Sequence, residues 1–152
     1  MPALSLINPF LWFDSNAVEA ARFYCSVFPN SRVVTQLPDT RDPNAPQPLT
    51  VSFELDGLRF TALNGGPHFK FNEAVSFVIT CQSQQEIDNY WKTLTADGGS
   101  ESQCGWLKDK FGLSWQVIPA QLGELLKHPA AMQALMKMKK LDIAELQRAG
   151  AS

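Results

Sequence analysis

The sequence predicts an α+β fold in which a strand–helix–three-strand module occurs twice within a single domain. Apolar and polar residues alternate along several short segments, whereas two longer segments carry apolar residues at helical spacing. The same order of elements runs over residues 6–64 and again over 74–119, and a helical extension follows over 120–152. Two local matches support the repeat: Phe23-Tyr24 corresponds to Tyr90-Trp91, and the segment from Gly57 to Thr61 corresponds to that from Gly112 to Gln116.

The composition restricts the function classes. The chain has 152 residues, of which 45% are hydrophobic and 18% are charged, as is ordinary for one globular domain. Its net charge of −2 gives no reason to expect a nucleic-acid partner, because such binding depends on Lys and Arg. No apolar run approaches the length of a membrane span, and the N-terminus does not resemble a secretion signal, so we expect a cytoplasmic protein. The three cysteines have no Cys-x-x-Cys spacing, which favours free buried thiols.

The first module begins with an aromatic strand over residues 6–13. Three of its side chains share one face: Asn8, Phe10 and Trp12. Asn16, with Glu19 three residues later, resembles a capping box, and the apolar stripe that follows predicts a helix over 16–28.

A second strand is expected over residues 31–37, and the segment 38–48 after it must be a loop. This segment places four prolines in eleven residues without periodicity. Long loops of this kind serve as lids or contact surfaces in some proteins, although an ordinary solvent-exposed loop is the favoured interpretation.

Residues 49–64 give the clearest local signal, two strands joined by Asp56-Gly57, which suits a type I′ turn. This turn fixes the pairs Leu55–Leu58, Glu54–Arg59, Phe53–Phe60, Ser52–Thr61, Val51–Ala62 and Thr50–Leu63. One face of the hairpin is therefore apolar and suits a covering helix, whereas the other is polar and suits a ligand cleft.

The second module follows a link over residues 65–72 and begins with a strand over 75–81. Ser83 and Glu86 form a capping box for a helix that ends before residues 97–99. The apolar stripe of this helix consists of Ile87, Tyr90, Trp91 and Leu94. The remaining strands lie within residues 100–119.

The segment 104–119 is predicted to form a hairpin around a turn at residues 109–112, and Pro119 ends its second strand. Three apolar side chains point to one face: Leu113, Trp115 and Val117. Ser114, Gln116 and Ile118 point to the other, which we take as a candidate pocket wall.

Helices are expected over residues 121–127, from Pro129, and from Asp142. We expect these helices to dock on the body of the protein or on a partner subunit. Their mixture of Met and Lys also allows a calmodulin-like or membrane-surface role, which is the less favoured interpretation.

The motif CGWLKDKFGLSWQVIP at residues 104–119, together with Asn64-Gly-Gly-Pro67 and Ala74-Val-Ser-Phe-Val78, resembles the PhnB-like branch of the vicinal oxygen chelate superfamily, the glyoxalase, bleomycin-resistance and extradiol-dioxygenase fold. The resemblance extends from about Ile7 to Leu146. It implies a fold of paired βαβββ modules and a homodimer, and relatives are often labelled 3-demethylubiquinone-9 3-methyltransferase.

Superfamily members that use a metal resemble one another in four ligand positions, which correspond here to Asn8, Thr61, residues 74–76 and Gln116. None of these is a histidine or a carboxylate, so we expect no intact metal site and no cofactor. The histidines lie elsewhere in the sequence. His68 in the link is considered as an acid/base group, with a plain linker residue favoured, and His128 is expected at the surface.

The sequence thus predicts a protein that binds a small organic ligand in a sheet-lined cleft, for sequestration or for an unassigned activity. The predicted ligand-binding residues are Phe10, Trp12, Thr61, Ser76, Trp106 and Gln116. For the aromatic members, a plain core role is the favoured interpretation.

Three alternative activities remain open. One is a metal-dependent lyase, isomerase or transferase of the glyoxalase type. The second is methyl transfer, against which stands the lack of a glycine-rich turn between a strand and a helix. The third is nucleophilic chemistry by Ser76 or Cys104, for which no histidine is placed as an activating base.

Overall fold

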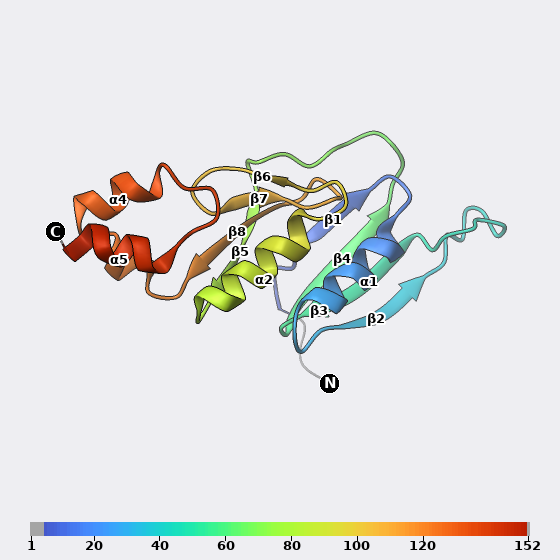
Figure 1. Cartoon of the computed structure of the whole chain (residues 1–152). Helices are drawn as coiled ribbons and strands as arrows, with labels where there is room; N and C mark the ends of the chain where they lie inside the picture. Colours follow the sequence, from blue (N-terminus) through green and yellow to red (C-terminus); the bar gives the residue numbers. More distant parts are fainter. Residues whose placement is uncertain (1–4, 152) are drawn as a thin grey trace. The chain divides into compact units, whose positions relative to one another are not determined.

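The computed structural model describes residues 5–151, and the chain divides into two compact units, Met1–Lys70 and Phe71–Ser152. Each unit contains a four-stranded sheet and a helix in the order strand–helix–three strands (Figure 1). The α+β fold and the repeated order of elements are confirmed, while the assignment of residues 1–152 to one domain stays a prediction. Residues 1–4 and 152 of that assignment lie outside the described residues.

The first unit contains sheet A, in which the strand order is β1-β4-β3-β2. The strands are β1 (Phe10–Phe13), β2 (Arg32–Leu37), β3 (Thr50–Leu55) and β4 (Leu58–Asn64). Strands β1 and β4 pair in parallel, and the other neighbours are antiparallel. Helix α1 (Ala17–Val27) packs against β2, β3 and β4. On this side Tyr24 stacks on Phe53 at 6.3 Å between ring centroids, and Phe53 stacks on Phe60 at 5.4 Å.

The β3–β4 hairpin has the predicted register at all six pairs, from Thr50 opposite Leu63 to Leu55 opposite Leu58. Its turn residues have positive φ angles, 49° at Asp56 and 83° at Gly57, as a type I′ turn requires. Val51 and Phe53 are completely buried on the helix side of β3. The turn in the sequence was therefore sufficient to fix the pairing, and the alternation was sufficient to fix the buried face.

The start of the first module differs from the prediction in two respects. Strand β1 begins at Phe10, so Asn8 lies before the strand, where its side chain donates to Ser5 O at 2.7 Å. Pro9 O still accepts from Thr61 N of β4 at 3.1 Å, but Pro9 has no N–H with which to continue a ladder. The side chain of Asn16 does not cap α1; instead Asn64 Oδ1 accepts from Ala17 N at 2.9 Å. The predicted capping box at Asn16 is thus wrong.

The second unit contains sheet B, in which the strand order β5-β8-β7-β6 repeats that of sheet A. The strands are β5 (Ser76–Cys81), β6 (Ser100–Glu101), β7 (Trp106–Lys108) and β8 (Ser114–Pro119). Helix α2 (Gln84–Thr95) packs against β5, β7 and β8. Its predicted capping box is present, because Ser83 Oγ accepts from Glu86 N at 3.2 Å. The reciprocal hydrogen bond of the box is shifted by one residue. The Glu86 carboxylate accepts from Gln82 N at 2.9 Å and not from Ser83 N, the donor expected in a capping box.

The turn between β7 and β8 is organised by a buried carboxylate. Asp109, with 2% of its surface exposed, accepts from the backbone N–H groups of Phe111 and Leu113 at 2.8 and 3.1 Å. Its second oxygen accepts from Trp115 Nε1 at 2.8 Å. Because donors from the turn and from β8 converge on one side chain, Asp109 fixes the start of β8 relative to the end of β7.

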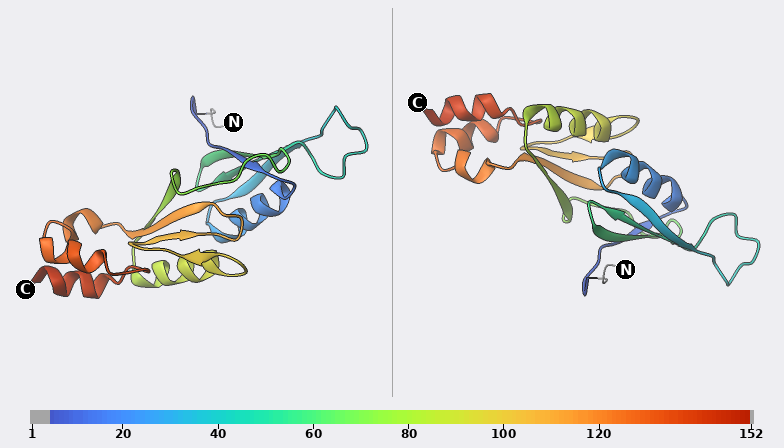
Figure 2. Two further views of the ribbon diagram at one scale, coloured as in Figure 1. Left: turned by 90° about the horizontal axis from the view of Figure 1, so that it is seen from above. Right: turned by 90° about the horizontal axis from the view of Figure 1, so that it is seen from below.

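The C-terminal helices α3 (Leu122–Leu125), α4 (Pro129–Leu135) and α5 (Ile143–Ala151) dock on the second unit itself. Figure 2 shows α4 and α5 side by side, and they surround an apolar cluster of Leu135, Met138, Leu141 and Leu146. Cys104 and Ile118 pack on this cluster from the body of the unit. Among the described residues, no helix is long and apolar enough to cross a membrane.

Candidate functional site

The face of sheet B opposite α2 brings three of the predicted ligand-binding residues together. We define this sheet B face by six residues: Ser76, Val78, Trp106, Lys108, Ser114 and Gln116. Two rows cross the strands, since Ser114 lies opposite both Ser76 and Lys108, and Gln116 lies opposite both Val78 and Trp106. Side chains directly opposite on neighbouring strands share a face and lie in contact range.

A hydrogen bond joins two of the predicted residues. Gln116 Nε2 donates to Ser76 Oγ at 2.9 Å, so the amide is oriented by a hydroxyl on the neighbouring strand. Both residues are half-buried, as is Trp106 on the other side of Gln116. The Gln116 carbonyl and the Ser76 hydroxyl proton can serve a polar ligand, and the indole of Trp106 offers a flat apolar surface.

Two further residues belong to this face: Ser114, which strand alternation placed on the candidate pocket wall, and Lys108, which sequence reasoning missed. Lys108 follows Trp106 by two positions in β7, and its ammonium forms an ion pair with Glu73, which precedes β5. The hydrogen bond from Lys108 lowers the pKa of the Glu73 carboxyl. Ser114 is 1% exposed, and its Oγ has no hydrogen-bond partner within the described part of the chain. The period-two spacing that assigned Ser114 to this face could also have identified Lys108.

The other three predicted residues lie on the face of sheet A opposite α1. Phe10 and Thr61 lie opposite each other on β1 and β4, and Phe10 is 59% exposed. Thr61 Oγ1 lies 3.4 Å from Ser52 Oγ on β3. An exposed ring next to two hydroxyl groups suits stacking and polar contacts with a small molecule.

Trp12, the third of these residues, is held by the link that follows β4. Its Nε1 donates to Gly66 O at 2.9 Å, and its ring meets Phe69 edge-on at 4.9 Å. Gly65 is required for this contact, because a Cβ there would lie 2.4 Å from the indole. His68 is exposed and lies edge-on to Trp12 at 6.4 Å. The indole N–H of Trp12 is therefore committed to the protein, and only its ring is left for a ligand.

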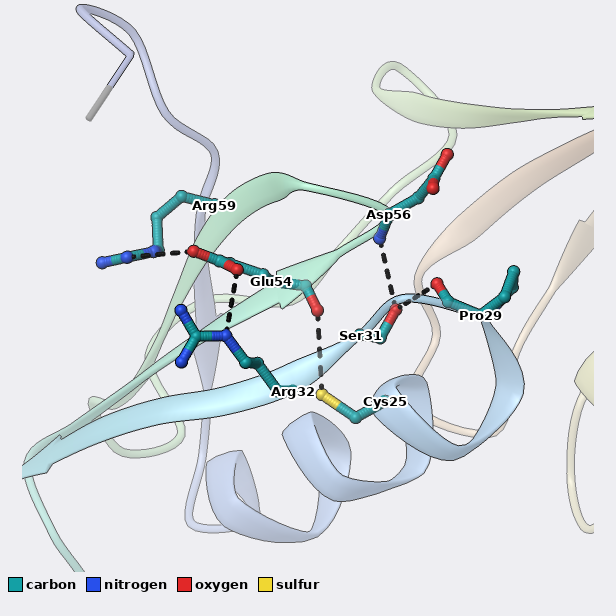
Figure 3. A network of polar contacts seen from close by, with 7 residues as sticks. All are labelled: Cys25, Pro29, Ser31, Arg32, Glu54, Asp56 and Arg59. Atoms are coloured by element: carbon teal, nitrogen blue, oxygen red, sulfur yellow. Dashed lines mark hydrogen bonds and ion pairs between the residues drawn. The ribbon is translucent and has the colours of Figure 1, made fainter. Parts of the chain in front are cut away.

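A charged network lies farther along the same face of sheet A (Figure 3). Glu54 bridges two guanidinium groups, with Arg59 Nη2 at 3.2 Å and Arg32 Nε at 3.3 Å. The hydrogen bond from Arg59, with a smaller contribution from Arg32, lowers the pKa of Glu54. The Glu54–Arg59 pair was predicted from the hairpin register, whereas Arg32 was not, because its strand pairs with β3 across a long loop.

The four positions expected for metal ligands do not fit a metal. Asn8 and Gln116 offer neutral amides whose nitrogen atoms donate to Ser5 and Ser76, and Thr61 and Ser76 offer hydroxyls. Divalent cations in proteins prefer carboxylates, imidazoles or thiolates. Within residues 5–151, no group of three or more His, Cys, Asp or Glu side chains could hold a metal ion.

Two cavities lie away from the predicted residues. A hollow of about 590 Å³ is bordered by the loop between β2 and β3, including Pro38, Asp39 and Pro46. This loop contains no helix or strand over residues 38–48, as predicted, and extends beyond the ends of β2 and β3 (Figure 2). A second hollow of about 280 Å³ lies among the C-terminal helices and includes His128 and Glu124.

The family model described as 3-demethylubiquinone-9 3-methyltransferase matches residues 5–118. The chain belongs to this family. A solved structure of the PhnB protein from Bacillus cereus, which carries the same methyltransferase designation, is 29% identical with a TM-score of 0.69. The match covers 76% of this chain and 100% of that one. The family match and this structure confirm the PhnB-like assignment.

Two more distant structures extend the likeness of the fold. Protein PA1353 from Pseudomonas aeruginosa is 22% identical, with a TM-score of 0.62 over 76% of this chain and 98% of that one. The fosfomycin resistance protein FosX from Listeria monocytogenes is 18% identical, with a TM-score of 0.59 over 84% of this chain and 100% of that one. At these identities the likeness shows the fold alone. A comparison with curated proteins finds no match.

Proposed function

We propose that this family member binds a small organic ligand on its sheet faces, with Ser76, Trp106 and Gln116 as the contacts from sheet B. The observation that carries the proposal is the hydrogen bond between Gln116 and Ser76, beside the ring of Trp106. An oriented amide, a hydroxyl and an indole are the groups that fix the position of a ligand. Phe10, Thr61 and the ring of Trp12 offer comparable contacts on sheet A.

The chemistry of these six residues favours binding or sequestration over catalysis. None of them is an acid, a base or an activated nucleophile near neutral pH. Cys104, the other nucleophile considered from the sequence, packs on the apolar cluster of the C-terminal helices. Binding to oriented polar groups and flat rings requires no metal and no cofactor. This agrees with the neutral amides and hydroxyls at the four positions expected for metal ligands.

Methyl transfer and metal-dependent lyase, isomerase or transferase activity are the alternatives. Methyl transfer is named by the family description. A nucleotide-type methyl donor is usually bound at a glycine-rich turn between a strand and a helix. Here the connections before α1 and α2, residues 14–16 and 82–83, contain no glycine. The family description therefore supports the assignment of the fold, but methyl transfer remains an alternative to ligand binding.

We further propose that the protein is a homodimer in the cytoplasm, as the family resemblance implies. Native mass spectrometry of the purified protein tests this proposal and the ligand proposal together, because subunit number and bound mass appear in one spectrum. We expect a dimer that retains an organic molecule.

The ligand arm compares wild type with Gln116→Ala and with Gln133→Ala, a control at an exposed position on α4. We expect Gln116→Ala to lose the bound mass with an unchanged melting temperature, whereas the control retains it. Retention of the mass by Gln116→Ala, or unfolding of that variant, contradicts the site. A stoichiometric divalent metal or a methyl-donor mass would favour the corresponding enzyme. If wild type retains no organic mass, a library of small organic molecules is screened for compounds that raise its melting temperature. A screen in which no compound binds counts against the proposal.

A further inference from the structure

The sheet B face carries one cation beside the predicted ligand contacts. Lys108 lies at the end of the row Lys108–Ser114–Ser76, directly next to the row that contains Gln116 and Trp106. Its side chain is 37% exposed, and its partner Glu73 is 64% exposed. An ammonium group and two hydroxyl groups are therefore aligned across three strands. This set consists of donors to oxygen and suits an oxyanion.

Ser114 provides an independent indication that an acceptor is missing from this row. It is 1% exposed, and its Oγ is one of two buried side-chain polar atoms without a partner within residues 5–151, the other being Arg59 Nε. Buried hydroxyl groups in proteins are almost always hydrogen-bonded, so an unpaired one requires an explanation. An oxygen atom attracted to Lys108 would reach the same row and accept from Ser114.

We propose that the sheet B face recognises a ligand with a carboxylate or phosphate-type group, which pairs with Lys108 and accepts from Ser114. Glu73 then serves as an internal substitute for the ligand, because its carboxylate pairs with Lys108 while no ligand is bound. Glu73 lies on the segment that precedes β5 and is mostly exposed, and exposed ion pairs of this kind are easily exchanged. This inference rests on the proposed function and adds the chemical class of the ligand.

The test uses inorganic phosphate and acetate as probes at constant ionic strength, with binding followed by chemical-shift changes of the amides of β7 and β8. We expect Lys108→Met to weaken binding roughly tenfold or more, since a charge-assisted hydrogen bond is lost. Lys140→Met is the matched control, because Lys140 forms a similar half-exposed ion pair with Asp88 at 2.8 Å. This control should bind the probes as wild type does.

Two further variants separate recognition from a structural role. Glu73→Gln removes the competing carboxylate, so we expect several-fold tighter binding of the probes. Ser114→Ala removes an unpaired buried hydroxyl, so we expect unchanged or higher stability together with weaker binding. If these side chains serve only the stability of the sheet, Glu73→Gln and Ser114→Ala should both lower the stability and leave binding of the probes unchanged.

Equal binding by wild type and Lys108→Met would show an adventitious ion only and would overturn the inference. Absence of binding by both wild type and Glu73→Gln would also overturn it. These failures are distinguishable from failure of the proposed function. If the organic mass retained by wild type is lost in Gln116→Ala but kept in Lys108→Met, the proposed ligand site stands and the oxyanion assignment fails.

Discussion

The thiol of Cys81 shows how burial determines the chemistry of a single residue. It lies at the end of β5 with none of its surface exposed. Burial, with a smaller contribution from the nearby Glu86 carboxylate, raises the pKa of this thiol from 9.0 to about 11. The thiolate is therefore disfavoured, and Cys81 is a packing residue, as predicted. Cys25 and Cys104 are free thiols as well, but they are only partly buried, so the prediction of burial is wrong for them.

This shift predicts a specific pH dependence of stability. Between pH 9 and 11 the folded protein keeps the Cys81 proton that the unfolded chain loses. The corresponding stabilisation is complete below the unfolded pKa and is lost as the pH rises through the folded one. The free energy of unfolding should thus fall more steeply in wild type than in Cys81→Ala over this window. Urea denaturation at several pH values measures both slopes, and parallel slopes would refute the prediction.

Single residues of the candidate site were only partly accessible to sequence reasoning. Gln116 and Ser76 were identified because strand alternation assigns residues to faces. Ser114 was assigned to the same face in this way, whereas Lys108 was missed. The ion pair of Lys108 with Glu73 and the unpaired state of the Ser114 hydroxyl depend on three-dimensional packing. The indole N–H of Trp12 donates to Gly66 O, which no local pattern indicates, so only the ring is left for a ligand. Ligand binding by all six residues stays a prediction.

At the scale of elements, local signals were reliable and distant ones were not. The β3–β4 hairpin was predicted pair by pair, because the Asp56-Gly57 turn determines the register of the two strands that it joins. The cap of α1 was wrong, because its acceptor, Asn64, lies 47 residues away in sequence from Ala17. A pattern within one turn of helix cannot reveal such a partner.

The same hairpin gives a prediction about its turn. Gly57 has a φ of 83°, and nothing lies within 4 Å of an added Cβ, so Gly57→Ala changes backbone strain alone. We expect a loss of about 1 kcal/mol in the free energy of unfolding. Gly123→Ala is the control, since it also has open space around the added Cβ but lies within helix α3, where alanine is favoured. Equal stability changes in the two variants, measured by denaturant unfolding, would disprove the strain argument.

At the scale of the whole molecule, the C-terminal extension is the part that the family does not explain. The family model ends at residue 118, whereas the extension packs on the second unit through its own apolar cluster. Backbone hydrogen bonds attach it as well, from Cys104 N to Met138 O and from Gly105 N to Lys139 O, each 2.8 Å long. The sequence predicted helices and docking here, but the choice between the body and a partner required the tertiary contacts.

One side chain of α2 holds the start of the last helix, and this leads to a prediction for the extension. Gln84 donates to Leu141 O at 2.9 Å and accepts from Ile143 N at 2.8 Å, so a single amide fixes the backbone on both sides of Asp142. Gln84→Ala should leave these groups without partners and loosen α5. We expect faster amide hydrogen exchange over residues 139–151 and unchanged exchange in β1 to β4.

The matched control for this experiment is Gln85→Ala, the exposed neighbour on the same helix. Both variants replace glutamine by a residue with higher helix propensity, so any difference between them reports the lost contacts rather than the stability of α2. Faster exchange confined to the extension would show that α5 opens as a local unit while the apolar cluster keeps the protein folded. Identical exchange in the two variants would mean that packing around Leu141 and Leu146 holds the extension without the amide of Gln84.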